Sequence, residues 1–247
     1  MKMGNTAINI IPNFIMTQQL IIIFTRYPEP GKTKTRLIPA LGEEGAANFQ
    51  RQMTEYTLNQ VKELQQILPI QIEIRFTDGN EDLMKKWLGS DLVYKYQGEG
   101  DLGEKLSRCV DDAIGLRPPT PLIARKVESL IIIGIDCPGV NPQILNQAFN
   151  SLQSHDLVIG PATDGGYYLI GLRHPMSQLF NQDLFNHDLF SWNLFSQKLF
   201  SGISWGTSEV LKQTIYIAEQ LNLSYELLPT LSDIDRPEDL ENFPALK

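Results

Sequence analysis

The sequence has few of the residues that build metal clusters and disulfide frameworks. Its 247 residues include two cysteines, Cys109 and Cys137, and three histidines. This number and spacing exclude a zinc ribbon and a disulfide-stapled scaffold. Because Cys137 has no histidine near it in the sequence, we interpret it as a small buried thiol rather than a nucleophile. Low cysteine usage is typical of a reducing compartment, so we expect a cytoplasmic protein.

Long apolar runs and an excess of positive charge are also missing. No run approaches the length of a transmembrane helix, and the net charge of −8 argues against a nucleic-acid surface. We therefore expect neither membrane nor nucleic acid among the partners. The weak apolar stretch near the start lacks the core of a signal peptide. We interpret residues 1–18 as a flexible extension, with Met16 as an alternative start.

A cluster of cations stands out in this acidic chain. It follows the apolar run Leu20–Phe24, which is typical of a buried strand, and places four cations within residues 26–36. Glycine lets backbone amides approach phosphate oxygens, lysine acts as a point charge, and arginine can bind two oxygens at once. The loop therefore predicts a site for a small anion, with a solvated basic loop as the alternative. The candidate residues are Gly31, Lys32, Lys34 and Arg36.

The remaining pattern alternates helices with short apolar strands. Helical periodicity covers residues 43–66, and strands are predicted at 70–76, 92–96, 129–135, 156–160 and 224–228. The run 129–135 is apolar throughout, as expected of a central parallel strand. Alternation of this kind indicates an α/β fold with a mostly parallel central sheet and helices on both faces. At this length we expect one domain, residues 19–247.

Three further segments carry polar residues where loops are expected. Residues 97–103 form a glycine-dense loop, in which Asp101 and Glu104 have the spacing of a helix capping box. Asp136 follows the central strand, where open α/β sheets bind ligands, although it could also only cap a neighbouring loop. Asp164, followed by two glycines, is typical either of a hairpin turn or of a polar pocket for an acceptor.

Residues 178–202 contain a Leu-Phe pair that recurs every five residues. Neither a helix nor a strand would place every pair on one side. The tract weakly resembles a pentapeptide repeat, but it is too short to be stable alone. We interpret it as a duplicated surface insert that could support self-association.

Taken together, five segments resemble one family. They are the basic loop 28–37, Gly-Asp-Leu-Gly-Glu at 100–104, Gly-Ile-Asp-Cys-Pro at 134–138, the turn 160–172 and Asp-Ile-Asp-Arg-Pro-Glu-Asp-Leu at 233–240. The chain is similar to nucleotide-diphospho-sugar transferases of the arsenosugar-biosynthesis and selenodomain-associated type, which are related to phospholactate guanylyltransferase.

The resemblance implies a type-A glycosyltransferase fold, which is Rossmann-like, and a role for each motif. Gly31, Lys32, Lys34 and Arg36 would hold the donor's diphosphate, while Gln97 and Gly103 would lie near its base and ribose. Asp136 and Asp235 would bind Mg²⁺ or Mn²⁺, and Asp164 would face the acceptor. Gly134 stands where a full Asp-x-Asp motif has its first aspartate, and Arg236 replaces the usual threonine. The first departure weakens the expectation of tight metal binding.

Three functions remain open at this point. The first is metal-dependent glycosyl transfer from a nucleotide sugar to a small-molecule acceptor, which would release a nucleoside diphosphate. The second is nucleotidyl transfer from a nucleoside triphosphate to a phosphorylated small acid or sugar, which would release pyrophosphate. The third is a nucleotide-binding or scaffold protein without catalysis. Base and sugar selectivity depend on the shape of the pocket, so the motifs choose neither donor nor acceptor.

Overall fold

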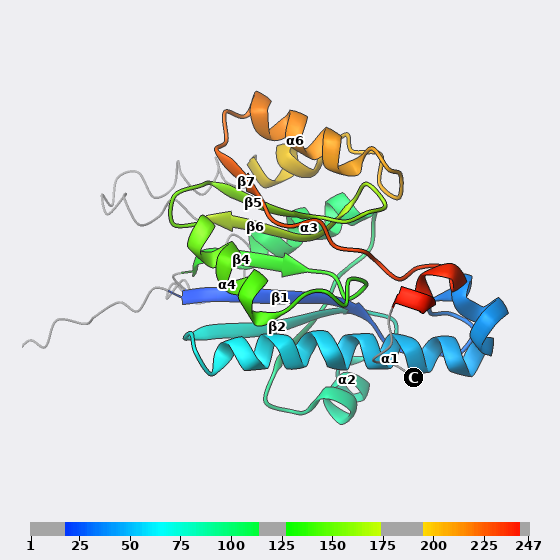
Figure 1. Cartoon of the computed structure of the whole chain (residues 1–247). Coiled ribbons are helices and arrows are strands. Elements are labelled where there is room, and N and C mark those ends of the chain that lie inside the picture. Colours follow the sequence, from blue (N-terminus) through cyan, green and yellow to red (C-terminus); the bar gives the residue numbers. More distant parts are fainter. Residues whose placement is uncertain (1–17, 114–126, 174–194, 243–247) are drawn as a thin grey trace, which may run out of the picture.

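A computed structural model describes residues 18–113, 127–173 and 195–242. It contains a seven-stranded sheet in the order β3-β2-β1-β4-β6-β5-β7 (Figure 1). Only β6 is antiparallel to its neighbours β4 and β5; the other pairs are parallel. The strands are β1 (Gln18–Arg26), β2 (Ile70–Thr77), β3 (Val93–Tyr96), β4 (Val127–Ile133), β5 (Leu157–Pro161), β6 (Tyr167–Arg173) and β7 (Tyr225–Leu227).

Helices cover both faces of this sheet and create two hydrophobic cores. The first core joins the sheet to α1 (Ile38–Gln65), α2 (Glu81–Leu88) and α4 (Pro142–Ser151). The second joins the opposite face to α3 (Leu102–Ala113), to α6 (Val210–Gln220) and to the helical residues 195–200. Successive residues of β1 alternate between the cores, Ile21 and Ile23 in the first, Leu20 and Ile22 in the second. The predicted three-layer α/β architecture is confirmed, and the continuous apolar run of β1 follows from burial on both faces.

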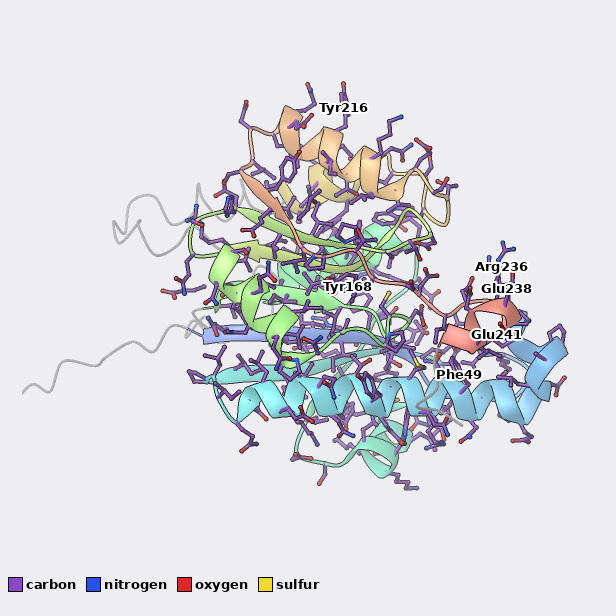
Figure 2. The ribbon with its side chains drawn as sticks, in the orientation of Figure 1. Phe49, Tyr168, Tyr216, Arg236, Glu238 and Glu241 are labelled. Atoms are coloured by element: carbon purple, nitrogen blue, oxygen red, sulfur yellow. The ribbon has the colours of Figure 1, made fainter. Side chains whose placement is uncertain are left out.

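Side chains show the same division between inside and outside (Figure 2). Phe49 of α1 is buried in the first core, whereas Tyr216 on the outer side of α6 is 62% exposed. Among the described residues, no helix is both long enough and apolar enough to span a bilayer.

Local signals set the helix boundaries. The side chains of Asn80 and Asn141 accept hydrogen bonds from Leu83 N and Ile144 N, each at 3.0 Å, and thereby cap α2 and α4. The capping box before α3 is confirmed by two reciprocal 2.9 Å bonds between Asp101 and Glu104. Regular helix in α1 begins after Gly42, whose φ of 70° interrupts a short first turn. The start expected at residue 43 is therefore correct for the main part of this helix.

The segment around Asp164 makes the hairpin that the sequence left open. It joins β5 to the antiparallel strand β6, which lies between β5 and β4. Gly165 has a φ of 89°, which suits such a tight turn. The same turn contributes to a cavity, described below, so the two interpretations of this segment are compatible.

The repeat tract differs from expectation where the structure describes it. Residues 174–194 lie outside the described residues, as do residues 1–17 of the expected N-terminal extension. The Leu-Phe pair of the last repeat unit is buried, since Leu199 and Phe200 are 0% and 3% exposed in the second core, whereas Lys198, Ser201 and Gly202 are exposed. Ser196 binds Asp111 of α3 at 2.7 Å. The prediction of a surface insert is therefore wrong for Leu199 and Phe200, whose side chains fill space between α3 and α6.

Candidate active site

The basic loop leaves the carboxyl end of β1 and turns back on itself. Lys32 N and Thr33 N both donate to Glu29 O, at 3.1 and 3.2 Å, and Thr33 Oγ1 donates to the same oxygen at 2.7 Å. Gly31 has a φ of 76°, a region that glycine adopts without steric cost. Lys34 has a left-handed φ of 47° just before the 3-10 helix η1 (Thr35–Leu37). This geometry turns the lysine side chain across the end of the sheet.

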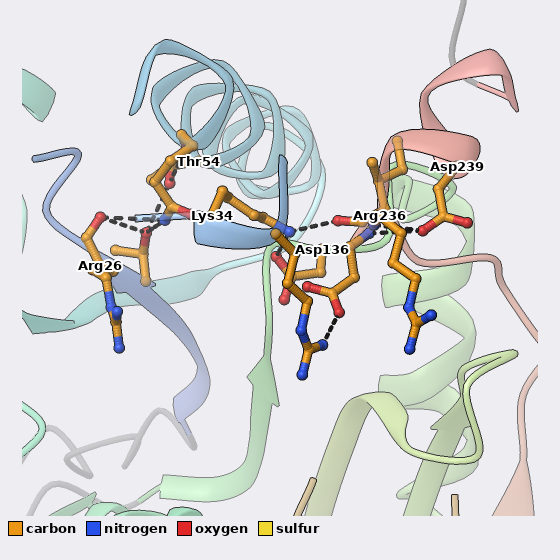
Figure 3. Close-up of polar contacts among 11 residues, drawn as sticks. Arg26, Lys34, Thr54, Asp136, Arg236 and Asp239 are labelled. Atoms are coloured by element: carbon orange, nitrogen blue, oxygen red, sulfur yellow. Dashed lines mark hydrogen bonds and ion pairs between the residues drawn. The ribbon is translucent and has the colours of Figure 1, made fainter. Parts of the chain in front are cut away.

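Lys34 joins three distant segments (Figure 3). Its Nζ lies 2.8 Å from Asp136 Oδ1, beyond the end of β4, and donates to Ile234 O at 2.5 Å. Ile234 N in turn donates to Asp136 O at 2.9 Å. The Lys34 side chain is only 6% exposed, so its charge is balanced inside the protein rather than by solvent.

Arg36 makes a second link of the same kind, since its Nη1 forms an ion pair with Asp235 Oδ2. Asp235 N and Arg236 N both donate to Asp239 Oδ2, at 3.0 and 2.7 Å, which fixes the tail before the 3-10 helix η3 (Pro237–Asn242). The structure thus brings Lys34, Arg36, Asp136 and Asp235 together at one edge of the sheet. The contacts of Lys34 with Ile234 and of Arg36 with Asp235 join residues that are 200 and 199 positions apart in the chain.

A cavity of about 640 Å³ opens at this edge between the ends of β1, β2 and β4 and the start of α3. Its charged lining is mostly positive. The described polar residues that line it are Thr25, Arg26, Lys32, Lys34, Thr35, Arg36, Gln50, Thr77, Gln97, Asp136 and Asp235. We call it the cation-lined cavity.

Lys32 and Lys34 stand very differently in this cavity. Lys32 is 63% exposed and lies 2.7 Å from Glu29 Oε1; the hydrogen bond to Glu29 raises the pKa of Lys32. Lys34 is enclosed and belongs to the network above. Both lysines were predicted to have the same role, but Lys34 is enclosed and Lys32 is exposed.

Gly31 and Gly103 are absent from the described residues that line either cavity of this site. A side chain at Gly103 would meet Phe200 O at 2.4 Å and Trp205 Nε1 at 2.6 Å. The expectation that Gly103 lies near the base and ribose stays a prediction, and the structure supplies a separate packing reason for a glycine here. This glycine permits the start of α3 to pack against residues 200–205.

Gln97 lines the cation-lined cavity, yet its amide group serves the sheet. Its Nε2 donates to Thr25 O and to Arg75 O, each at 3.0 Å, and so ties the ends of β1 and β2 together. Arg108 holds the following loop by donating to Gln97 O at 2.6 Å and to Glu99 O at 2.8 Å. The loop expected near the nucleotide is thus rigidly attached to β1, β2 and α3.

A second cavity, of about 880 Å³, adjoins the first. The two share Arg36, Leu102, Gly134, Asp136, Tyr167, Tyr168 and Asp235. Five aspartates line the second cavity, opposed by two arginines; these residues are Asp136, Asp164, Asp233, Asp235, Asp239, Arg36 and Arg236. We call it the acid-lined cavity.

Asp164 and Asp233 lie close together in the acid-lined cavity. Gly166 N donates to Asp164 Oδ1 at 2.8 Å, and Thr163 Oγ1 donates to Asp233 Oδ1 at 3.1 Å. Burial, together with the negative charge of Asp164, raises the pKa of Asp233. Burial also raises the pKa of the Cys137 thiol, and the charges of Asp136, Asp233 and Asp164 act in the same direction. Cys137 is thus kept protonated, as expected of a buried thiol.

Several site residues were not predicted from the sequence. Gln50 of α1 is 5% exposed and donates to Thr25 Oγ1 and Arg26 O, each at 3.2 Å, so it positions the end of β1. The only sequence feature that set Gln50 apart was its polar side chain within the apolar stripe of a predicted helix. Asp233 was recognised only as a neighbour of Asp235. Tyr167 lies in the motif 160–172, but Trp205, which meets it edge to face at 6.3 Å, gave no signal.

Neither cavity holds a complete metal cage. In the described part of the chain, no three His, Cys, Asp or Glu side chains are grouped closely enough to bind a metal ion. Asp136 and Asp235 provide carboxylates at the boundary of the cavities, and each carboxylate already has a cationic neighbour.

The fold and this site can now be compared with known proteins. Residues 58–187 match the model of the family DUF2064, described as "Uncharacterized protein conserved in bacteria". A proposed nucleotide-diphospho-sugar transferase from Desulfovibrio desulfuricans G20 is similar in structure. It has 30% sequence identity and a TM-score of 0.72, and the match covers 90% of this chain and 84% of that one. No curated protein matches this chain in sequence.

Two more distant structures share the fold. The 4-diphosphocytidyl-2C-methyl-D-erythritol synthase of Anaerococcus prevotii DSM 20548 has 13% identity and a TM-score of 0.51, covering 91% of this chain and 94% of that one. A CMP:2-keto-3-deoxy-manno-octonic acid synthetase in complex with CTP has 10% identity and a TM-score of 0.50, covering 93% and 98%. The resemblance and the fold predicted from the sequence are confirmed. The chain belongs to the DUF2064 family and has the fold of nucleotide-diphospho-sugar transferases, which are enzymes of the transferase class.

Proposed function

We propose that this protein is a metal-dependent transferase that uses a nucleotide-activated donor. The favoured reaction is glycosyl transfer from a nucleotide sugar to a small-molecule acceptor. The observation that carries the proposal is the pair of adjoining cavities, one lined by cations and one by acids, which share Asp136, Asp235 and Arg36. A donor with its phosphates in the first cavity would have its reactive end at the entrance to the second.

The cation-lined cavity suits the phosphates of the donor. Lys34 has three N–H donors, of which Asp136 and Ile234 O use two, so one remains for a phosphate oxygen. Arg36, 66% exposed beside Asp235, can turn its remaining N–H groups to the same phosphate. Donors that are already in place where negative charge develops on the leaving group stabilise the transition state without reorganisation.

The donor set also fits a divalent cation bound together with the donor. Mg²⁺ is usually held by one or two carboxylates plus phosphate oxygens rather than by a cage made only of protein groups. Asp136 and Asp235 would supply those carboxylates. The ion would neutralise charge on the leaving phosphate. Asp136 and Asp235 also orient Lys34 and Arg36, so their role does not depend on the ion alone.

Asp164 is our candidate for the group that activates the acceptor. Gly166 N donates to Asp164 Oδ1 and so fixes the orientation of this carboxylate. The carboxylate belongs to a tight turn that lines the acid-lined cavity. A positioned carboxylate that accepts the proton of an attacking hydroxyl typically contributes about 10²–10⁴-fold to the rate.

Nucleotidyl transfer is the alternative. The Anaerococcus synthase and the CTP-bound synthetase share the fold with this chain, so the sheet edge is compatible with that chemistry as well. The likeness to the Desulfovibrio protein, at higher identity, favours glycosyl transfer. The phosphate product separates the two: a nucleoside diphosphate for the first, pyrophosphate for the second.

The test begins with a thermal-shift panel of nucleoside diphosphates, nucleotide sugars and nucleoside triphosphates, each with and without Mn²⁺. A ligand at about 100 times its Kd adds about 2.7 kcal/mol to the stability of the folded state, which raises Tm by several degrees. We expect stabilisation by one class of nucleotide, increased by Mn²⁺. No response to any nucleotide would overturn the proposal. Binding without metal dependence and without turnover would instead favour a non-catalytic protein.

The remaining expectations stay predictions. They are a single domain over residues 19–247, a cytoplasmic location, the absence of nucleic-acid and membrane partners, and self-association through the tract 178–202.

A further inference from the structure

The residues that line the acid-lined cavity include more than the proposed general base, Asp164. Its described lining contains five aspartates against two arginines, and one of these arginines, Arg36, is already ion-paired with Asp235. Arg236 is exposed, in the turn before η3 (Figure 3). Among the described lining residues, an anion that entered the cavity would therefore face several carboxylates and one guanidinium, that of Arg236, without an ion pair.

The carboxylates nearest to the hairpin turn are held in place. Asp164 Oδ1 is bound by Gly166 N, and in the described part of the chain Asp164 Oδ2 has no hydrogen-bond donor. Asp233 is bound through Thr163. The turn is anchored to the start of α6, where Leu211 N donates to Gly165 O at 2.9 Å. A Cβ at Gly165 would lie 2.3 Å from Ser208 O, so the two segments are in close contact. The carboxylate oxygens of Asp164 and Asp233 therefore lie at fixed positions.

Aromatic rings and hydroxyl groups complete the wall. Tyr167 and Trp205 meet edge to face on one side, and Thr207, Ser208 and Ser232 also line the cavity. Carboxylates accept hydrogen bonds, hydroxyl groups donate and accept them, and aromatic rings cover apolar C–H groups. This combination matches a molecule with several hydroxyl groups.

Given the proposed function, on which this inference rests, we infer that the acceptor is an uncharged, hydroxyl-rich molecule such as a sugar or polyol, and that phosphorylated or carboxylated acceptors are excluded. Like charges placed together at a binding site repel one another, which disfavours anionic acceptors. An amine would be held in its protonated form by the carboxylates and would have no lone pair to attack with. An uncharged hydroxyl avoids both penalties.

The transfer balances without any further reactant. The acceptor oxygen bonds to the anomeric carbon of the donor sugar, while the bond from that carbon to the diphosphate oxygen breaks and leaves its electron pair on the phosphate. The hydroxyl proton passes to Asp164 Oδ2. The products are the glycosylated acceptor, a nucleoside diphosphate and a proton, which Asp164 then returns to water.

The inference is tested with matched sets of acceptors and the donor that the nucleotide panel selects. Each set holds an uncharged compound, its phosphate ester and its amine, for example glucose, glucose 6-phosphate and glucosamine, or ribose and ribose 5-phosphate. Release of nucleoside diphosphate is measured for every member. We expect turnover of uncharged members at least 10-fold above that of their phosphate esters. A phosphate ester that is used as well as its uncharged partner would overturn the inference.

Saturation-transfer NMR on the full chain provides a readout that does not require turnover. Each set is presented to the protein alone and to the protein with the selected nucleoside diphosphate. Signal from the uncharged members and none from the phosphate esters is expected; no signal from any uncharged member, or signal from the phosphate esters, counts against the inference. In Asp233→Asn, which removes one carboxylate but keeps an oxygen for Thr163, the preference over phosphate esters should shrink severalfold. An unchanged preference would show that charge does not set it.

Failure of this inference is distinguishable from failure of the proposed function. If nucleotides bind and a phosphorylated acceptor is preferred, the donor site stands and only the acceptor class is wrong. If no nucleotide binds, the proposed function fails whatever the acceptor measurements give.

Discussion

The two cavities lie side by side, and their charges are balanced in opposite ways. In the cation-lined cavity the charges are already paired: Lys34 with Asp136, Arg36 with Asp235 and Lys32 with Glu29. In the acid-lined cavity Asp164 and Asp233 are held by neutral donors, a backbone amide and a threonine hydroxyl. The first arrangement keeps cations pre-positioned at little electrostatic cost. The second leaves carboxylates that can still accept a proton or a hydroxyl group.

The largest expected effect lies in the acid-lined cavity. Asp164→Asn keeps an oxygen for Gly166 N but removes the base, so kcat should fall by about 10²–10⁴-fold. The folded state and the affinity for the donor should be almost unchanged, because no ion pair is lost. Steady-state kinetics with the selected donor, beside a thermal-unfolding curve, checks both expectations. Weaker donor binding with normal kcat would contradict the assignment of donor binding to one cavity and of the base to the other.

In the cation-lined cavity the two lysines form a matched pair. Lys34→Met removes an enclosed ammonium from between Asp136 and Ile234 O, and we expect kcat/KM to fall by about 10²–10³-fold, as for loss of a fixed transition-state donor. Lys32→Met, at a 63% exposed side chain, should cost less than about fivefold, since exposed ion pairs contribute little. Kinetic constants of both variants decide the point. Equal losses would mean that position and burial do not distinguish these lysines.

Two glycines separate packing from ligand contact. Gly103→Ala should lower the free energy of unfolding by about 1–3 kcal/mol, because its Cβ meets Phe200 O and Trp205. Gly134→Ala has open space around its Cβ and lines both cavities, so it should leave stability unchanged and weaken ligand binding. Urea unfolding and nucleotide titration of both variants give the answer. Normal stability with weakened nucleotide binding in Gly103→Ala would support the nucleotide role expected from the sequence.

The smallest effect concerns an aspartate that serves the fold rather than a cavity. Asp156 binds Ser224 N and Oγ at 3.0 and 2.6 Å and Arg173 Nη2 at 2.7 Å. Burial alone would raise the pKa of Asp156, but the bonds from Ser224 and Arg173 outweigh it and lower the pKa. A pKa that is lower in the folded state stabilises the protein above the unfolded-state pKa, and this contribution is lost as pH falls through the folded-state pKa.

Asp156→Asn should therefore cost about 1 kcal/mol at pH 7, an amount limited by partial exposure, and its difference from the wild type should shrink below about pH 4. Urea unfolding at pH 7 and pH 3 measures this difference. A difference that grows on acidification would contradict the assigned direction of the shift.

The fold was largely predictable because its signals are local. Continuous apolar runs marked β1 as a buried strand and β4 as a central one, and the capping box of Asp101 and Glu104 marked the start of α3. The position of Lys34 and Asp136 at one edge of the sheet followed from a rule of topology, since loops at the carboxyl ends of parallel strands meet there. Asp235 was assigned to the same site only by the family resemblance.

The sequence did not predict several contacts between distant segments, because such contacts have no local sequence signal. Gly103 packs against residues about 100 positions later, and Ser196 binds Asp111 across 85 positions. The five-residue period did not distinguish Leu199 and Phe200 from the other Leu-Phe pairs, although both residues are buried. Gln50 could not be recognised because its role consists of hydrogen bonds to the end of β1, a separate segment of the chain.

The measurement that tests the central claim most directly is a calorimetric titration with the nucleoside diphosphate that the panel selects. Wild type, Lys34→Met and Asp164→Asn are titrated in parallel with Mn²⁺ present. Division of labour between the cavities predicts that Kd rises at least 10-fold in Lys34→Met and stays within about twofold of wild type in Asp164→Asn, a difference of about 1.4 kcal/mol or more between the variants. Equal affinities in all three proteins, or a loss confined to Asp164→Asn, would contradict it.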